Sequence, residues 1–362
     1  MSPSVTILCI VLISSLIFTS ADFVPRLMIS DYSNVEVSRV GLGTLHLGDK
    51  CTGITDAKEV NEWILYAVDE LGITLFDLAD VYPVKCGNSG DSATLFGQAL
   101  AMTPGLRERL ALVAKMDIIF PSAIDTTPTY LTQQVDWFLQ VLQTTYLDIV
   151  LLHYGNAYMD ADAVANLFYN LKVQGKVLNF GVSNHYPSKF DLLQSKLESY
   201  RNIDDNSVDP SLIAVEFECS VWNPSYLNYD SALVDHAYQK GIHPLAWGAL
   251  GGEPTGGFNR LFLRKGKRQT KIRSKLSEIG KELGIEGEDT VALLWLLSHP
   301  SRMIPLLGTT NTDRLSSQVK AFQYLGNMTN AQWWSIGSAA GLCPLGDSQC
   351  NYNEYNPNIP DL

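Results

Sequence analysis

TLFDLADVY, residues 74–82, is the stretch of the sequence that decides the fold. It opens with the apolar and β-branched residues of a buried strand and then carries two carboxylates and a phenol. A charged group such as Asp77 is costly at the end of a buried strand unless a partner neutralises it. The stretch therefore predicts a strand over 74–78 that brings Asp77, and Tyr82 just beyond it, to a polar edge of the fold.

Two other apolar runs end in the same way, each on one ionisable residue. LALVAK (110–115) ends on Lys115, and LDIVLLH (147–153) ends on His153. Taken singly, an Asp–Lys pair is more often structural, and a histidine after an apolar strand is more often a satisfied core residue. An acid, an ammonium, an imidazole and a phenol gathered at one edge favour a reaction site instead.

After its first segment, the chain alternates short β-branched runs with amphipathic stretches, which predicts an α/β fold. Eight strands are expected, over 39–45, 74–78, 110–115, 147–152, 178–182, 213–217, 241–246 and 303–307. Helices are expected between them, over 57–71, 131–144, 163–174, 229–240 and 270–283. A glycine follows four of these helices, as is common just past a helix C-terminus.

This order of elements fits either a closed (β/α)8 barrel or a doubly wound open sheet. Two observations favour a single-domain (β/α)8 TIM barrel over residues 27–340. No Gly-x-Gly-x-x-Gly turn follows the first strand, and the polar residues follow many different strands. Residues 341–362 are expected to form an irregular tail, and 194–209 a long polar loop.

The charge of the chain limits its partners. With 38 acidic and 26 basic side chains, the net charge of −12 repels nucleic acid and anionic lipid. We therefore expect a small-molecule substrate and no nucleic-acid partner, and any binding of phosphate has to be local. The sequence carries no signal for the oligomeric state.

The first segment, residues 1–21, stands apart from the rest. Residues 5–18 form a nearly unbroken apolar run without charge, and the small residues Thr19, Ser20 and Ala21 follow it. This pattern predicts a cleaved secretory signal, and hence a secreted or ER-lumenal protein. Because the segment contains no Lys or Arg, an uncleaved membrane anchor and an organelle-targeting leader stay open. The run is too short to favour a spanning helix.

The cysteines give an ambiguous signal about the compartment. Beyond the leader, only Cys343 and Cys350 look like a disulfide pair, since they lie close together in the Gly- and Pro-containing tail. Two unrelated thiols are an equally good interpretation. Asn327 begins the glycosylation sequon Asn-Met-Thr. No cysteine spacing resembles a zinc site, so no metal is expected.

The strand ends, together with GLGTLHLG, GKVLNFGVSN, PLAWGALGG and IPLLGTTN, resemble the aldo-keto reductase family over about residues 40–322. The similarity is greatest to a branch of bacterial oxidoreductases. In that family the residues that match Asp77, Tyr82, Lys115 and His153 form the catalytic tetrad. The resemblance implies an NADP(H)-dependent enzyme that reduces aldehyde or ketone carbonyls to alcohols.

The resemblance also assigns a role to each residue of the tetrad. Tyr82 is the general acid, and the ammonium of Lys115 is expected to lower the phenol pKa from its reference value near 10 toward the working range. Asp77 would hold Lys115 charged and in place. His153 would donate a hydrogen bond that orients the substrate carbonyl.

Four residues are implied at the nicotinamide end of the cofactor. Ser183 and Asn184 match the pair that holds the carboxamide, and Trp247 matches the aromatic residue that stacks on the ring. Glu216 stands where the family usually has glutamine. A carboxylate accepts hydrogen bonds but cannot donate one unless it is protonated.

Three residues are implied at the adenosine end. Thr309, Arg314 and Gln318 match positions around the 2′-phosphate, and Arg314 favours NADP(H), with NAD(H) left possible. Two positions depart from the family, because Gly308 replaces a basic residue and Ala93 an acidic one.

A second class of function remains open. Some barrels of this family act as nicotinamide-bound, redox-sensing auxiliary subunits of membrane proteins with little turnover.

The substrate pocket is expected to include Leu45, His46, Tyr154, Asn156, Trp222 and the Gly-rich stretch 251–258, which could be a lid or simply mobile.

Overall fold

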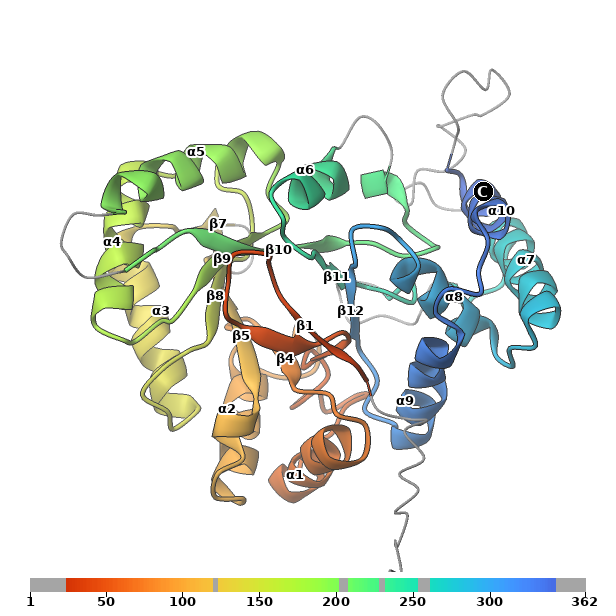
Figure 1. Cartoon of the computed structure of the whole chain (residues 1–362). Helices are drawn as coiled ribbons and strands as arrows, with labels where there is room; N and C mark the ends of the chain where they lie inside the picture. Colours follow the sequence, from red (N-terminus) through yellow and green to blue (C-terminus); the bar gives the residue numbers. More distant parts are fainter. Residues whose placement is uncertain (1–23, 120–122, 202–207, 228–231, 253–260, 343–362) are drawn as a thin grey trace, which may run out of the picture.

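A closed barrel of eight parallel strands forms the centre of the molecule (Figure 1). The computed structural model describes residues 24–119, 123–201, 208–227, 232–252 and 261–342. Neighbouring strands follow the order β10-β11-β12-β3-β4-β5-β8-β9. The predicted barrel and its eight strands are confirmed. Their bounds are β3 Gly41–Gly43, β4 Leu75–Ala79, β5 Ala111–Met116, β8 Ile149–Leu152, β9 Phe180–Ser183, β10 Leu212–Glu218, β11 Leu245–Trp247 and β12 Ile304–Leu307.

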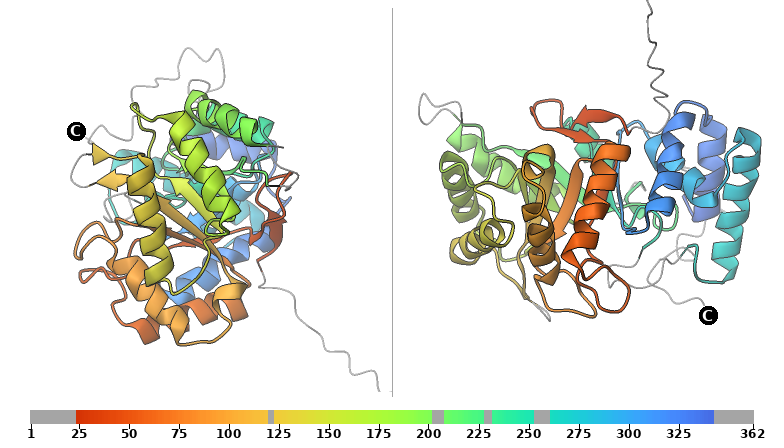
Figure 2. Two further views of the ribbon diagram at one scale, coloured as in Figure 1. Left: turned by 90° about the vertical axis from the view of Figure 1, so that its left-hand side faces the viewer. Right: turned by 90° about the horizontal axis from the view of Figure 1, so that it is seen from below.

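Helices surround the barrel, as the view from below makes clear (Figure 2). Their bounds are α1 Ala57–Leu65, α2 Asp91–Ala101, α3 Pro128–Val141, α4 Ala161–Val173, α5 Pro187–Leu197, α6 Leu233–Gln239, α7 Lys267–Leu283, α8 Glu288–Leu297, α9 Thr312–Val319 and α10 Asn330–Ala340. Gly175 and Gly284 take the left-handed conformation after α4 and α7, both at φ 70°, which is the predicted way for these helices to end.

One predicted loop is wrong in its first part. Residues 194–197 form the last turn of α5, and Glu198–Tyr200 continue it as a short 3-10 turn. The polar composition misled the prediction, because Leu193 and Leu197 are fully buried and hold this turn against the core. Residues 202–207 lie outside the described chain, as do residues 1–23, which include the leader (1–21), and most of the tail (343–362).

An antiparallel hairpin that the sequence did not reveal precedes the barrel. It consists of β1 (Arg26–Met28) and β2 (Glu36–Ser38). Leu27, Ile29 and Val37 are buried in one apolar cluster with residues that face the barrel interior. The hairpin therefore closes the end of the barrel opposite the strand C-termini, and the opposite end is left for polar side chains.

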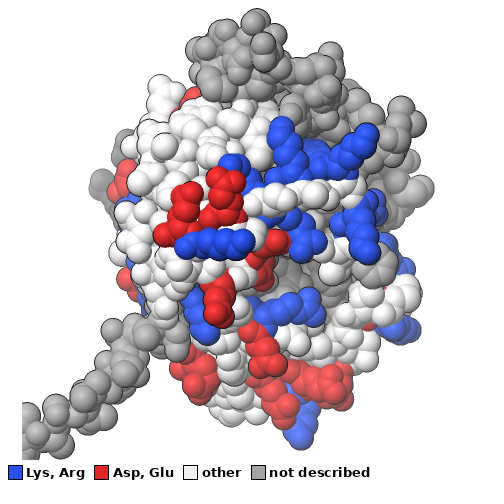
Figure 3. Space-filling model, turned by 90° about the vertical axis from the view of Figure 1, so that its right-hand side faces the viewer, with Lys and Arg blue, Asp and Glu red and all other residues white. Residues whose placement is uncertain are grey.

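Basic side chains gather on the outer face of the molecule around α7 (Figure 3). The helix begins Lys-Arg-Gln-Thr-Lys-Ile-Arg, in a chain whose net charge is −12. A cavity of about 730 Å³ runs along this helix and is lined by polar residues such as Thr270, Arg273 and Glu288. It lies outside the barrel and apart from the strand ends.

Within the described part of the chain, no helix combines the length and the hydropathy needed to cross a membrane.

Candidate active site

The site is built on the inward-facing positions of four strands. Leu75, Val113, Leu151 and Ala214 belong to the apolar cluster inside the barrel. Successive inward positions are two residues apart, because side chains alternate between the two faces of a strand. The next inward positions toward the strand C-termini hold an acid, an ammonium, an imidazole and a second acid, namely Asp77, Lys115, His153 and Glu216.

Lys115 is the centre of this polar layer. Its Nζ forms an ion pair with Asp77 Oδ2, and it lies 2.9 Å from Glu216 Oε1. The three residues are 1%, 3% and 1% exposed, so water does not screen them. Burial alone would lower the pKa of Lys115, but the charges of Asp77 and Glu216 outweigh it and hold this pKa well above its usual value. Lys115 is therefore a permanent cation.

The two carboxyl groups compete for this single cation. Burial raises the pKa of Asp77, and Lys115 opposes that effect. Burial and repulsion from Asp77 raise the pKa of Glu216 to about 8, again against the effect of Lys115. The sequence predicted one acid beside Lys115, whereas the structure brings two. Glu216 was expected to face the cofactor, and its bond to Lys115 had no local signal in the sequence.

Tyr82 lies three residues beyond β4, with its backbone held by the start of α2. Its carbonyl oxygen accepts hydrogen bonds from Gly90 N at 3.0 Å and Ser92 N at 3.2 Å. Lys115 Nζ lies 5.4 Å from the centre of the phenol ring. The ring centre of His153 is 6.2 Å away, with the two rings nearly perpendicular. The tetrad thus converges in space as the resemblance implied.

The expected lowering of the Tyr82 pKa is wrong in its net direction. Burial raises the pKa of this phenol above its ordinary value. Lys115 does act in the predicted direction, but Asp77 and Glu216 both raise the pKa and so offset the ammonium. Tyr82 therefore holds its proton firmly at neutral pH.

His153 follows β8 and is neutral. Burial and the nearby charge of Lys115 hold its pKa well below the usual value. Its Nδ1 is buried and has no hydrogen-bond partner within the described residues, and its ring stacks on Tyr154 with centres 5.4 Å apart. A neutral imidazole still has one N–H donor, so His153 can donate to a carbonyl oxygen without carrying a charge.

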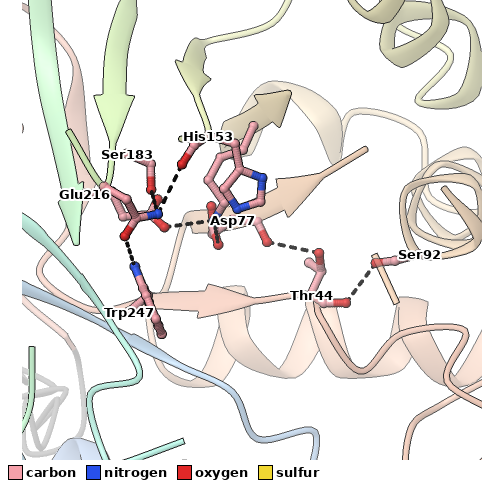
Figure 4. A network of polar contacts seen from close by, with 9 residues as sticks. Thr44, Asp77, Ser92, His153, Ser183, Glu216 and Trp247 are labelled. Carbon is pink, nitrogen blue, oxygen red and sulfur yellow. Dashed lines mark hydrogen bonds and ion pairs between the residues drawn. The ribbon is translucent and has the colours of Figure 1, made fainter. Parts of the chain in front are cut away.

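A second set of contacts fixes the position of Asp77 (Figure 4). Thr44 donates to the Asp77 carbonyl oxygen twice, from its N at 3.0 Å and from its Oγ1 at 2.9 Å. Ser92 Oγ donates to the Thr44 carbonyl oxygen at 2.8 Å. Sequence reasoning missed both residues, whose only signal is a short hydroxyl side chain at an element end.

Asn184 joins three strand ends rather than standing free. Its Nδ2 donates to the carbonyl oxygen of His153 at 3.1 Å and to Ser183 Oγ at 3.0 Å. Its Oδ1 accepts a hydrogen bond from Trp247 Nε1 at 3.0 Å. Ser183 and Trp247 therefore lie near Glu216, His153 and Asp77 (Figure 4), and both N–H groups of the Asn184 amide are engaged within the protein.

The nicotinamide residues still fit a carboxamide. Glu216 Oε2 is buried and, among the described residues, has no hydrogen-bond partner. An unpaired buried polar atom is costly unless a ligand satisfies it. Asn184 Oδ1 keeps one lone pair beyond the bond from Trp247. These two atoms could receive and hold an amide group.

The three adenosine positions lie in different surroundings. Thr309 lies in the turn after β12, and Arg314 is an exposed side chain in the first turn of α9. Gln318 is buried, and its Nε2 donates to Asp289 Oδ2 at 3.1 Å, so its side chain is held by the start of α8. Gly308 is exposed, and a Cβ added there would meet no other atom within 4 Å. Of these three positions, Arg314 thus provides a positive charge that is accessible to a ligand.

A disulfide that the sequence did not predict joins two loops at the C-terminal end of the barrel strands. It links Cys51, after β3, to Cys86, four residues past Tyr82, with Cα atoms 5.7 Å apart. Lys50 N donates to the Cys86 carbonyl oxygen at 3.0 Å and supports the same junction. Cys343 and Cys350 lie outside the described residues. Separated by 35 positions, Cys51 and Cys86 gave no local signal.

Two further acids are buried at this end of the barrel. Burial raises the pKa of Asp80 to about 7 and that of Asp117 well above its usual value. Both oxygens of Asp117 accept from Tyr154 N at 3.2 Å. Tyr130 donates to Asp80 Oδ2 at 3.4 Å. Sequence reasoning passed over these residues, although Asp80 stands in the opening motif.

Some of the expected substrate-pocket side chains are held by contacts within the protein, and one is exposed. Trp222 is buried beneath the guanidinium of Arg268, 4.1 Å from its ring centre, and Asn156 Nδ2 donates to Thr126 Oγ1 at 3.0 Å. Tyr154 is 39% exposed. Residues 253–258 of the expected lid lie outside the described chain. Tyr154 is therefore the accessible aromatic group beside His153.

Comparison with known proteins agrees with this geometry. The Aldo/keto reductase family matches residues 39–340. Oxidoreductase YdhF of Escherichia coli is 32% identical over 75% of this chain and 84% of its own length. A 6-dehydroglucose reductase of Agrobacterium fabrum is 28% identical over 87% and 97%, respectively. A thermostable aldo-keto reductase, Tm1743, solved with the inhibitor epalrestat, shares the fold with a TM-score of 0.67 at 20% identity, over 87% of this chain and 99% of that one.

Proposed function

Since the chain belongs to the aldo/keto reductase family, we propose that it is an NADP(H)-dependent oxidoreductase that reduces aldehyde or ketone carbonyls to alcohols. The observation that carries the proposal is the convergence of Tyr82 and His153 on one buried cation, Lys115. A phenol that keeps its proton and a neutral imidazole N–H are the two donors that a carbonyl oxygen needs.

The tetrad residues divide the work on the substrate. His153 donates to the carbonyl oxygen and orients it, and Tyr82 supplies the proton that this oxygen takes up. Lys115 stabilises the negative charge that remains on Tyr82 once the proton has left. Asp77 holds Lys115 in place, and Thr44 holds the backbone of Asp77.

NADPH, when bound, supplies the hydride for the carbonyl carbon. The residues that would hold its nicotinamide end are Ser183, Asn184, Glu216 and Trp247. The exposed guanidinium of Arg314, in the first turn of α9, would hold the 2′-phosphate, since arginine binds phosphate well. This cation is the reason that we favour NADP(H) over NAD(H).

Substitution of Tyr82 by phenylalanine tests the proposal. Purified wild-type protein should oxidise NADPH in the presence of a panel of aldehydes and ketones, and Tyr82→Phe should lose at least about a hundredfold in kcat, the range of one general acid. NADPH binding, followed by the quenching of protein fluorescence, should survive in the variant. Binding without turnover by the wild type would instead support the alternative, a redox-sensing auxiliary subunit.

We further propose that the protein enters the secretory pathway and loses residues 1–21 there. Three features support this placement. The leader is apolar, the Cys51–Cys86 disulfide suits an oxidising compartment, and Asn327 of the sequon is exposed just before α10. The proposal places a nicotinamide-dependent site in the lumen or outside the cell.

A further inference from the structure

Two buried carboxyl groups face one buried ammonium at the rim of the barrel. Lys115 Nζ contacts Asp77 Oδ2 and lies 2.9 Å from Glu216 Oε1. If all three groups were ionised, one negative charge would remain uncompensated and away from water, which is costly. One proton kept by the two carboxyls makes the cluster neutral.

Glu216 is the better holder of that proton. Asp77 makes the closer contact with Lys115, so its anion gains more from the cation. The second oxygen of Glu216, Oε2, is buried and receives no hydrogen bond from the described residues, and the Glu216 carboxyl lies within hydrogen-bonding reach of the Asp77 carboxyl, an interaction that raises the pKa of Glu216 and lowers that of Asp77. Burial and repulsion from Asp77 raise the pKa of Glu216 to about 8, which agrees with a carboxyl that is protonated at neutral pH.

We propose that Glu216 is protonated in the working enzyme and donates a hydrogen bond from its carboxylic acid to the cofactor carboxamide, while Asp77 alone neutralises Lys115. This inference rests on the proposed function. A carboxylic acid has one O–H donor and one acceptor oxygen, so it restores the donor that a carboxylate lacks at this position. Loss of the proton removes that donor and adds a buried negative charge beside Tyr82.

The surroundings of Glu216 contain few groups that could mimic this titration. The charged or titratable side chains around it are Asp77 of β4, Tyr82 after β4, Lys115 of β5, His153 and Tyr154 after β8, and Glu218 on its own strand. His153 stays neutral because burial lowers its pKa, and Lys115 stays charged. Among these groups, Glu216 and Asp77 are therefore the pair that changes charge near neutral pH; Asp80 and Asp117, whose pKa values are also raised, form hydrogen bonds to Tyr130 and Tyr154 instead.

The binding of NADPH across pH tests this inference. The dissociation constant is measured by fluorescence quenching from about pH 6 to about pH 9 for the wild type, Glu216→Gln and Glu218→Gln. Wild-type affinity should fall roughly tenfold as Glu216 loses its proton, the usual effect of one lost hydrogen bond at a buried group. Glu216→Gln keeps a donor and should bind equally well at every pH, and Glu218→Gln should follow the wild type.

Infrared difference spectra of the protein without cofactor give a second, independent readout. The wild-type minus Glu216→Gln spectrum should contain one carboxylic-acid C=O band that disappears with a midpoint near pH 8, the pKa of Glu216. Absence of this band, or an unchanged pH dependence of NADPH binding in Glu216→Gln, overturns the inference. The wild type could instead bind NADPH with this pH dependence and reduce no carbonyl compound. That result would refute the proposed reaction and leave the role of Glu216 in cofactor binding supported.

Discussion

Lys115 and Glu216 are 101 positions apart in the chain and meet inside the barrel, with Nζ 2.9 Å from Oε1. Two strands, β8 and β9, separate their own strands in the closed sheet, so the contact crosses the interior rather than following the rim. It gives Lys115 a second buried carboxyl partner. When Glu216 is ionised, its charge raises the phenol pKa of Tyr82 that the ammonium lowers.

Removal of the central cation should destabilise the fold. Lys115→Met leaves Asp77 and Glu216 buried without their partner and should lower the free energy of unfolding by about 3–5 kcal/mol, the usual cost of breaking a buried ion pair. Denaturant unfolding measures this loss. Lys176→Met is the matched control, since the Lys176–Asp136 pair is 35% and 52% exposed and should contribute no more than about 1 kcal/mol. Equal losses in the two variants would contradict the central role of Lys115.

The disulfide should stabilise the protein through its unfolded state. The Cys51–Cys86 bond links positions 35 residues apart, and the loss of a crosslink of that span should cost about 3–4 kcal/mol. The double variant Cys51→Ser/Cys86→Ser should therefore unfold at lower denaturant concentration. A reductant should reproduce this shift in the wild type and leave the double variant unchanged. Peptide mapping without reduction should recover the linked pair, and recovery of other pairings would argue against it.

Asp80 should make the fold less stable as the pH rises. Burial raises its pKa to about 7 in the folded protein, whereas in the unfolded chain it ionises near 3.9. Between these values the folded state binds more protons, so the free energy of unfolding falls as pH rises and stays low above the folded-state pKa. Asp80→Asn should remove a penalty on the order of 3 kcal/mol at pH 8 and little at pH 4.

Thermal or denaturant unfolding at several pH values measures that difference. Asp136→Asn, at an exposed position, is the control for the loss of one negative charge. If the gain in stability from Asp80→Asn is the same at acid and alkaline pH, then the carboxyl of Asp80 is not held protonated by the fold.

A lysine at position 308 should strengthen the preference for NADPH. Gly308 is exposed, and a Cβ added there would meet no other atom within 4 Å. Gly308 is also not one of the glycines with a positive φ, so a side chain at this position is not strained. A cation beside the start of α9 would add a second contact to the 2′-phosphate and should raise the NADPH-to-NADH ratio of kcat/KM about tenfold, the value of one charged hydrogen bond. Gly308→Gln controls for side-chain bulk, and Arg314→Ala should lower the same ratio. If the ratio is unchanged both in Gly308→Lys and in Arg314→Ala, the preference for NADP(H) loses its support.

Expression in a secretory host should yield a processed glycoprotein. The N-terminal sequence of the secreted protein should begin near residue 22, and treatment with an endoglycosidase should reduce its mass. Asn327→Gln should abolish the mass change, because Asn327 is the one sequon and is exposed. Recovery of an intact, unglycosylated chain would refute the proposed route.

The sequence by itself predicted the barrel, and it placed Asp77, Lys115 and His153 at the ends of strands. Inward positions recur every two residues along a strand, and an apolar run that ends on an acid, a lysine or a histidine is visible without any partner strand. The same alternation holds in β10, where Glu216 follows Ala214 by two residues. Alternation is consistent with Glu216 on the inner face, and the family resemblance assigned it to the cofactor, but neither could say which side chain it would meet.

Only the tertiary structure decided which of these groups touch. The tilt and stagger of a closed sheet fix which inward positions face each other across the interior, and no local pattern carries that information. The Lys115–Glu216 bond, the Cys51–Cys86 disulfide and the hairpin under the barrel all depend on it. The pKa of Tyr82 depends on it too, because burial and distant charges add up only when the chain is folded, and together they outweigh the ammonium that the sequence placed nearby.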